Sequence, residues 1–180
     1  QLEDPFVVRI NGELVLGGTR VDFSRGKLSG FCGVFYKGTN LFNLYYFTTG
    51  PQQMKDIRYV QLTDGKVGVF SRPRGEEIRK KYGSEAVIGF TVLNSINELD
   101  ADVVERATAI EGVFGRDEWG GCNQCLLLEN GKIGVIGHGC YNEFDGTINQ
   151  LVYTNIAFVF DPETFQVSDL KMIGTRKSYP

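Results

Sequence analysis

The sequence contains little cysteine, one histidine and no long apolar stretch, and each scarcity removes a class of protein. Four cysteines are too few for a disulfide framework in 180 residues. The CxxC pair Cys122 and Cys125 is accompanied by a single histidine, His138, so the ligand set of a typical zinc site is missing. Cysteines three residues apart on a strand point to opposite faces. We therefore expect both to be small buried apolar residues and predict no metal.

Nucleic acid and membranes are not expected partners. Lys and Arg number 19 against 22 Asp and Glu, the formal net charge is −3, and the basic residues are scattered along the chain. No apolar run approaches the ~20 residues that cross a bilayer, and no apolar leader opens the chain. We expect a soluble, cytoplasmic protein, and the composition sets no oligomeric state.

The sequence is instead rich in β-strand signals punctuated by its 23 glycines. We expect one helix over residues 95–110, where Ser95 to Glu98 resembles a capping box. The charged segment 72–85 is expected to be a solvated loop. The alternating residues Tyr45, Tyr46 and Phe47 are expected to lie in the core.

One hairpin pattern occurs three times. "DPFVVRINGELVLGG" begins at Asp4, "DIRYVQLTDGKVGVFSR" at Asp56 and "NQCLLLENGKIGVIGHG" at Asn123, and each turns at Asn-Gly or Asp-Gly. Further strand-like runs separate the three, so the units are expected to be four-stranded. The pattern predicts a single all-β domain, a β-propeller, with units at about 1–50, 51–112 and 113–180. A β-sandwich with three similar hairpins is the alternative. Because propellers close with ~4–8 blades, the domain is expected to be incomplete.

Polar residues stand at the start of each predicted unit, where the first strands of propeller blades line a shared funnel. Cleavage of a glycosidic bond needs a carboxylic acid and either a second carboxylate or an anionic nucleophile. Lysine and arginine can hold phosphate, and aromatic rings can stack on sugars. The residues expected to converge are Glu3, Asp4, Lys55, Asp56, Arg72, Trp119, Asn123 and His138.

Most of these positions also have a structural interpretation. Asp4-Pro5 is a common turn dipeptide, and Asp56 has local ion-pair partners in Lys55 and Arg58. A strand-end histidine is often buried and hydrogen-bonded, and a tryptophan often packs between sheets. For Arg72 and Arg176 the structural interpretation is an ion pair that holds blades together.

The ordered motifs "LEDPF", "MKDIR", "EWGG" and "GHG" resemble those of the five-bladed β-propeller glycosidases and phosphorylases acting on β-mannosides, and in particular a sister group of unknown function labelled the MTP family. The resemblance implies that this chain lacks the first blade and part of the last. It also implies that Asp4 donates a proton, that Lys55 lies near an anion site, and that Arg72 and His138 line the pocket. Phe6 replaces the family's arginine, which favours hydrolysis or binding without turnover over phosphorolysis.

We therefore predict a glycosidase or glycoside phosphorylase acting on β-linked hexosides, with an oligosaccharide or glycoside as ligand. No cofactor is expected, and inorganic phosphate is the co-substrate if the reaction is phosphorolysis. The alternative is a non-catalytic carbohydrate-binding or interaction propeller. The catalytic residues are predicted to be Asp4, Glu3 and Asp56, and the substrate-binding residues Lys55, Arg72, Trp119, Asn123 and His138.

Overall fold

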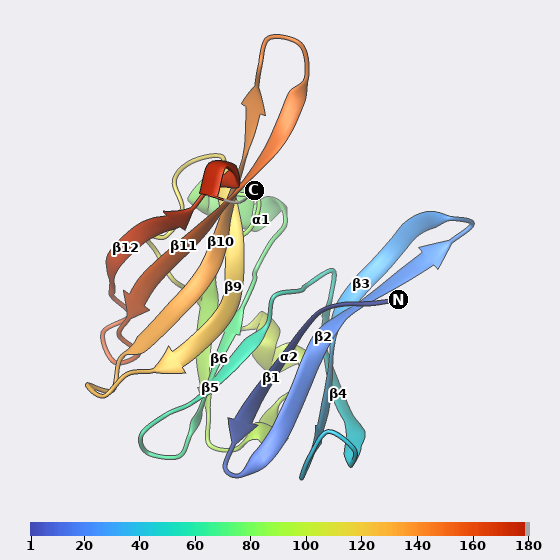
Figure 1. Ribbon diagram of the computed structural model, residues 1–180, viewed down its shortest axis with the longest axis vertical. Helices are drawn as coiled ribbons and strands as arrows, with labels where there is room; N and C mark the ends of the chain where they lie inside the picture. The colour runs from blue at the N-terminus through green and yellow to red at the C-terminus, as the bar shows by residue number, and fades with distance from the viewer. Residues whose placement is uncertain (179–180) are drawn as a thin grey trace. The chain divides into compact units, whose positions relative to one another are not determined.

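The computed structural model describes residues 1–178 and contains three four-stranded sheets, each built from strands consecutive in the chain (Figure 1). The first sheet has the order β1-β2-β3-β4, the second β5-β6-β7-β8 and the third β9-β10-β11-β12. The strands are β1 (Leu2–Ile10), β2 (Glu13–Ser24), β3 (Lys27–Gly38), β4 (Leu44–Gln52), β5 (Arg58–Gln61), β6 (Val67–Ser71), β7 (Gly89–Leu93), β8 (Thr108–Ala109), β9 (Glu118–Leu127), β10 (Ile133–Phe144), β11 (Asn149–Phe160) and β12 (Val167–Gly174).

The chain forms two compact units. Residues 1–71 and 90–108 make up unit 1, and residues 72–89 and 109 onward make up unit 2. The core of unit 1 lies between the first two sheets, where Ile10, Val15 and Phe35 pack with Tyr59 and Val67. In unit 2, one face of the third sheet buries Ile133, Val135, Phe158 and Phe160.

The three predicted hairpins are present. β1 pairs antiparallel with β2, β5 with β6 and β9 with β10. At the first turn, Asn11 and Gly12 have φ of 49° and 84°, which is the left-handed backbone of a type I′ turn. At the other two turns, Asp64-Gly65 and Asn130-Gly131, the glycine has the positive φ, 82° and 78°.

The turn of the first hairpin is joined to the second hairpin by amide side chains. The Asn11 backbone N–H donates to Gln61 Oε1 at 2.8 Å, and Gln61 Nε2 donates to Asn11 Oδ1 at 2.6 Å. Asn11 Nδ2 also donates to the carbonyl of Gly65 at 3.2 Å. These three bonds, the amide latch, hold the ends of the first two hairpins together within unit 1.

The predicted helix over residues 95–110 is wrong, because two N-caps divide the segment. The Ser95 hydroxyl accepts from the Asn97 N–H and begins the 3₁₀ helix η1 (Ile96–Glu98). Leu99 is extended, and the Asp100 carboxylate then accepts from the Val103 N–H at 2.8 Å and begins α2 (Ala101–Glu105).

Two other expectations are also corrected. Segment 72–85 contains the exposed helix α1 (Glu76–Tyr82), whose acidic first turn and basic last turn complement the helix dipole. Tyr45 and Tyr46 are 53% and 58% exposed, because β4 is the outer strand of its sheet. A further short 3₁₀ helix, η2, spans Arg176–Ser178. None of the described helices combines the length and apolar composition needed to cross a membrane.

Cys122 and Cys125 are both buried, as expected, but they lie on the same face of β9. Cys122 pairs with Gly137 and Cys125 with Val135, two residues apart on β10. The register shifts between these pairs because Asn123 is an extra residue in β9. This β-bulge reverses the alternation of side chains, so the prediction of opposite faces is wrong.

Candidate functional site

The first strands of the first and third sheets each contain a bulge at a predicted site residue. In β1, Glu3 pairs with Thr19 and Phe6 with Gly17, so the Asp4-Pro5 dipeptide lies opposite Gly18 alone. In β9 the bulged residue is Asn123. Bulges redirect side chains and occur often beside active sites. Asp4 and Asn123 stand at equivalent places in the sequence repeat, and each lies at a β-bulge.

Two of the predicted catalytic carboxylates have a left-handed backbone. Asp4 has φ of 49° and Asp56 has φ of 60°. Aspartate adopts this region more readily than most residues, but outside a turn it still costs conformational energy. Such conformations persist where the surrounding structure fixes them, and they cluster at functional sites. The aspartates of the motifs "LEDPF" and "MKDIR" are thus two of the eight described non-glycine residues with positive φ.

In unit 1 the structure brings Asp4 and Lys55 together. Asp4 Oδ2 lies 3.7 Å from Lys55 Nζ, and the side chains are 50% and 37% exposed. Glu3 is half-buried and accepts from Gln1 Nε2 at 3.0 Å, while Asp56 is buried. The Asp4 group, defined as Glu3, Asp4, Lys55 and Asp56, therefore presents one accessible carboxylate beside one accessible ammonium.

Arg58 is a residue that our sequence reasoning considered only as an ion-pair partner. It is 7% exposed, and its guanidinium carbon lies 4.5 Å from the centroid of the Phe6 ring. Arg58 Nη1 donates to the carbonyl of Ile57 at 3.0 Å. The resembled family has an arginine where this chain has Phe6. Here the Phe6 ring is covered by Arg58 of β5. Arg58 is the last residue of the motif "MKDIR". Its contact with Phe6 could not be read from that motif, because the contact depends on how the first two sheets pack.

In unit 2 the structure brings His138 and Asn123 together. His138 Nδ1 lies 2.8 Å from Asn123 Oδ1. The cross-strand partner of His138 on β9 is Gly121, and Trp119 is two residues earlier on the same face of that strand. Trp119 is half-buried. The His138 group, defined as Trp119, Asn123 and His138, combines an aromatic ring, an amide and an imidazole.

Arg72 follows directly after β6 and is 8% exposed. Burial raises the pKa of the Cys140 thiol, and the Tyr153 hydroxyl and the Arg72 guanidinium oppose that rise. The guanidinium is therefore close enough to act electrostatically on β10, where Cys140 is two residues from His138. Arg176, by contrast, is an exposed residue of η2.

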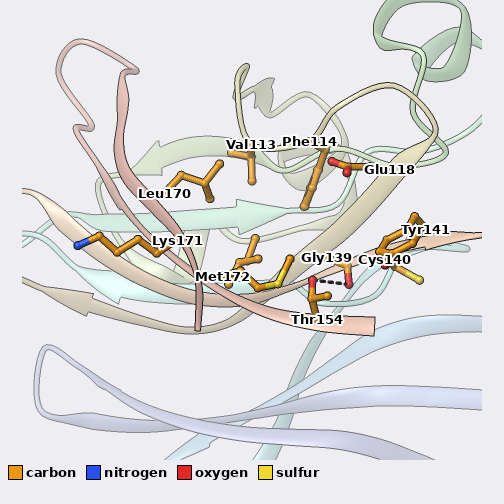
Figure 2. A pocket seen from close by; sticks show the side chains of 11 residues that line it. Val113, Phe114, Glu118, Gly139, Cys140, Tyr141, Thr154, Leu170, Lys171 and Met172 are labelled. Carbon is orange, nitrogen blue, oxygen red and sulfur yellow. Dashed lines mark hydrogen bonds between the residues drawn. The ribbon is translucent and has the colours of Figure 1, made fainter. Parts of the chain in front are cut away.

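Unit 2 contains a cavity whose wall includes Cys140 but none of the predicted site residues (Figure 2). Its volume is about 190 Å³, and Thr154, whose hydroxyl donates to the carbonyl of Gly139, lies in its wall with Phe114 and Met172. Gly139 and Thr154 are on the face of the third sheet opposite His138. The volume is below the ~300 Å³ of typical ligand sites, so we assign no ligand to it. Within residues 1–178 no cluster of His, Cys, Asp and Glu is arranged to hold a metal.

Comparison with known proteins places the chain in a family. The model of the family described as "Protein of unknown function (DUF1861)" matches residues 1–180. A search of curated proteins finds no match. Among solved structures, a mannose phosphorylase from Leishmania mexicana in complex with phosphate ion is 48% identical, with a TM-score of 0.90. A GDP-Man-dependent mannosyltransferase from the same organism is 42% identical, with a TM-score of 0.87.

The match covers 100% of this chain and 54% of each of these two relatives, so the chain spans about half of their length. A thermostable family-43 glycoside hydrolase is 8% identical over 95% of this chain and 52% of its own, with a TM-score of 0.57. At that identity the likeness shows the fold alone. The fold is a β-propeller, and the three four-stranded sheets are three of its blades.

Proposed function

This chain belongs to the DUF1861 family, and we propose that it forms part of an enzyme that transfers mannosyl groups between a β-linked glycoside and inorganic phosphate. The observation that carries the proposal is the Asp4 group, in which a carboxylate on a bulge lies 3.7 Å from the Lys55 ammonium. The two relatives of 48% and 42% identity, a mannose phosphorylase and a mannosyltransferase, support the sugar.

The proposed reaction needs a proton donor and an anion site. The glycosidic C–O bond breaks as a phosphate oxygen forms a new C–O bond to the sugar, and Asp4 gives its proton to the departing oxygen. Because phosphate is itself the anionic nucleophile, no second carboxylate has to attack. Lys55 binds the phosphate oxygens by charge-assisted hydrogen bonds, and within unit 2 Arg72 and His138 are further substrate-binding residues. Glu3 and Asp56 then orient Lys55, while Trp119 and Asn123 bind the sugar.

Phosphate is favoured over water as the acceptor, in spite of Phe6. The sequence suggested that the loss of arginine at position 6 removes a cationic contact. However, Arg58 covers the Phe6 ring, so this part of unit 1 retains a guanidinium. The relative of 48% identity was solved with phosphate bound, which agrees with an anion site in this family of folds.

We propose that the chain is part of a five-bladed propeller. Three blades correspond to about half the length of the two relatives, which suits a propeller of five or six blades. The motif series resembles the five-bladed type. Asp4 then belongs to the first strand of one blade, and the His138 group to the first two strands of another.

The test is product formation by the complete protein from β-mannobiose and inorganic phosphate, followed by ³¹P NMR. We expect mannose 1-phosphate, and a loss of at least about 100-fold in the Asp4→Asn variant, because a general acid contributes about 10²–10⁴-fold. Asparagine suits the variant because it accepts positive φ. The matched control is Asp22→Asn, whose 49% exposed carboxylate is also paired, with Arg20 at 3.2 Å.

Three other outcomes would contradict the proposal or part of it. If Asp4→Asn is as active as Asp22→Asn, Asp4 is not the acid. If no sugar phosphate forms and GDP-mannose is consumed instead, the protein is a transferase like the 42% identical relative. If β-mannobiose binds without turnover of either donor, the chain belongs to a carbohydrate-binding propeller.

A further inference from the structure

The β10–β11 hairpin of unit 2 extends beyond its sheet (Figure 1). Pairing with β9 stops at Tyr141, and pairing of β11 with β12 begins at Asn155, so residues 142–151 project as a two-stranded ribbon. Asp145 orders the tip by accepting from the N–H groups of Thr147 and Ile148 at 2.8 and 3.0 Å and from Gln150 Nε2 at 2.6 Å. The ribbon is therefore built as a defined element.

The face of this ribbon that continues from His138 alternates amides with apolar or aromatic side chains. Because the register is unbroken, cross-strand pairs at every second position share this face. The aromatic and aliphatic members are exposed: Tyr153 by 54%, Leu151 by 50% and Phe144 by 68%. The pairs are His138 with Asn155, Cys140 with Tyr153, Asn142 with Leu151 and Phe144 with Asn149.

The chemistry of this face suits an uncharged polar polymer. Residues 138–155 are all described, and this face carries no aspartate, glutamate, lysine or arginine, whereas Glu143 lies on the opposite face. Phosphate backbones and charged peptides need opposite charges to bind. Neutral sugars need ring faces for stacking and amides for hydrogen bonds to hydroxyl groups. The face supplies both.

The face is also continuous with the His138 group. The rings of His138 and Tyr153 have centroids 6.0 Å apart, and His138 contacts Asn123. From His138 to Phe144 the strand advances by about 20 Å at ~3.4 Å per residue. This length accommodates several sugar units in a row, beginning at the candidate site.

We propose that this face, from His138 to Phe144, is an extended subsite that binds the oligosaccharide chain of a β-mannoside substrate. The inference rests on the proposed function for the identity of the sugar. It assigns Tyr153 and Phe144 the role of stacking platforms and Asn142 and Asn149 the role of hydrogen-bonding groups. The protein then prefers long oligosaccharides to short ones.

The experiment measures the affinity of the complete protein for linear β-mannotetraose and for β-mannobiose by isothermal titration calorimetry. The tetrasaccharide is expected to bind more tightly than the disaccharide. Phe144→Ala and Tyr153→Ala are expected to weaken tetrasaccharide binding by about 3- to 10-fold, the range of one aromatic contact. The matched control is Phe23→Ala, which removes a 55% exposed ring from the β2–β3 hairpin.

Phe144 is at the exposed tip, so its variant keeps the test valid even if Tyr153→Ala, beside buried Cys140, fails to fold. Equal affinity for the two sugars, or a Phe144→Ala variant that binds like Phe23→Ala, would overturn the inference even if mannose 1-phosphate is formed. A dimer that dissociates in Phe144→Ala, with no effect on sugar binding, would also overturn it. Length-dependent binding lost in Phe144→Ala supports the subsite even if the transfer reaction is absent.

Discussion

The Arg58 guanidinium lies over the ring of Phe6, 4.5 Å from its centroid, and joins β5 to the bulged strand β1. The ring also meets Phe35 and Tyr59, at centroid distances of 6.4 and 5.7 Å. Phe6, two residues after Asp4, therefore packs in the unit 1 core and makes a cation–π contact with Arg58. Its substitution is expected to lower the stability of unit 1 and to remove the ring that Arg58 covers.

Replacing Phe6 by leucine is expected to lower the free energy of unfolding by about 1–3 kcal/mol. The change removes the cation–π interaction, about 0.5–2 kcal/mol, together with the aromatic contacts. Chemical denaturation with a single fluorescence or circular dichroism probe measures the loss. The control is Phe42→Leu, because Phe42 is fully exposed and its loss should leave stability unchanged. Equal effects of the two variants would contradict the assigned contact.

Replacing Gly17 by alanine is expected to destabilise unit 1 by about 1–3 kcal/mol through overpacking. A Cβ on Gly17 would clash with Phe6 Cε1 and lie 2.9 Å from Phe35 Cδ1. Gly30→Ala is the control, because the nearest atom to its Cβ is a flexible Gln53 amide at 3.5 Å. In a Phe6→Leu background the Gly17→Ala penalty should shrink, and full additivity of the two changes would refute the clash.

Alkaline pH is expected to destabilise unit 1 through Tyr59. Burial raises the pKa of the Tyr59 phenol well above its usual value, and the smaller effect of Arg58 opposes the rise. Above about pH 10 the unfolded chain releases the proton while the folded protein keeps it, so stability falls by up to about 1.36 kcal/mol per pH unit. This stability is fully present below pH 10 and is lost as the pH rises towards the folded pKa.

Tyr59→Phe removes that slope in denaturation curves recorded between pH 8 and 11. Because the Tyr59 hydroxyl has no hydrogen-bond partner among residues 1–178, the variant is also expected to be more stable at pH 7, by about 1 kcal/mol. The control is Tyr45→Phe, whose side chain is 53% exposed. An unchanged slope in Tyr59→Phe would assign the alkaline transition to other groups.

The sequence predicted the hairpins and the all-β class because both depend on local signals. Asn-Gly and Asp-Gly favour the turn conformation wherever they occur, and alternation follows from the geometry of a strand. The helix over residues 95–110 failed for a local reason as well: Asp100 competes as a second N-cap, and the apolar stripe did not reveal the break.

The bulges and the partners of the site residues could not be predicted in the same way. A bulge depends on the pairing register with the neighbouring strand. The segment "GGCNQC" alone therefore does not show that Asn123 is the extra residue. For this reason the faces of Cys122 and Cys125 were predicted wrongly. The contacts of Asp4 with Lys55 and of Phe6 with Arg58 join residues about 50 positions apart. The repeat suggested the first of them, and nothing in the sequence indicated the second.

Removing the Asn11 side chain is expected to loosen the contact between the first two hairpins. Asn11→Gly keeps a residue that accepts positive φ but deletes the side-chain bonds to Gln61 and Gly65. We expect a loss of about 1–2 kcal/mol in the free energy of unfolding. Asn130→Gly is the control, because Asn130 bonds locally to the backbone of Lys132. Equal losses would show that the bonds between hairpins contribute nothing.

The amide latch also constrains how unit 1 folds. Its bonds connect residues 50 positions apart in the chain, so they form only after the segment up to Gln61 has been synthesised and its loop has closed. The strands of the first sheet can pair with one another earlier. The β1–β2 turn, however, can form the bonds of the amide latch only after β5 has folded against it. We therefore expect mutations in the latch to change the rate of unfolding more than the rate of folding, because late contacts are absent from the transition state.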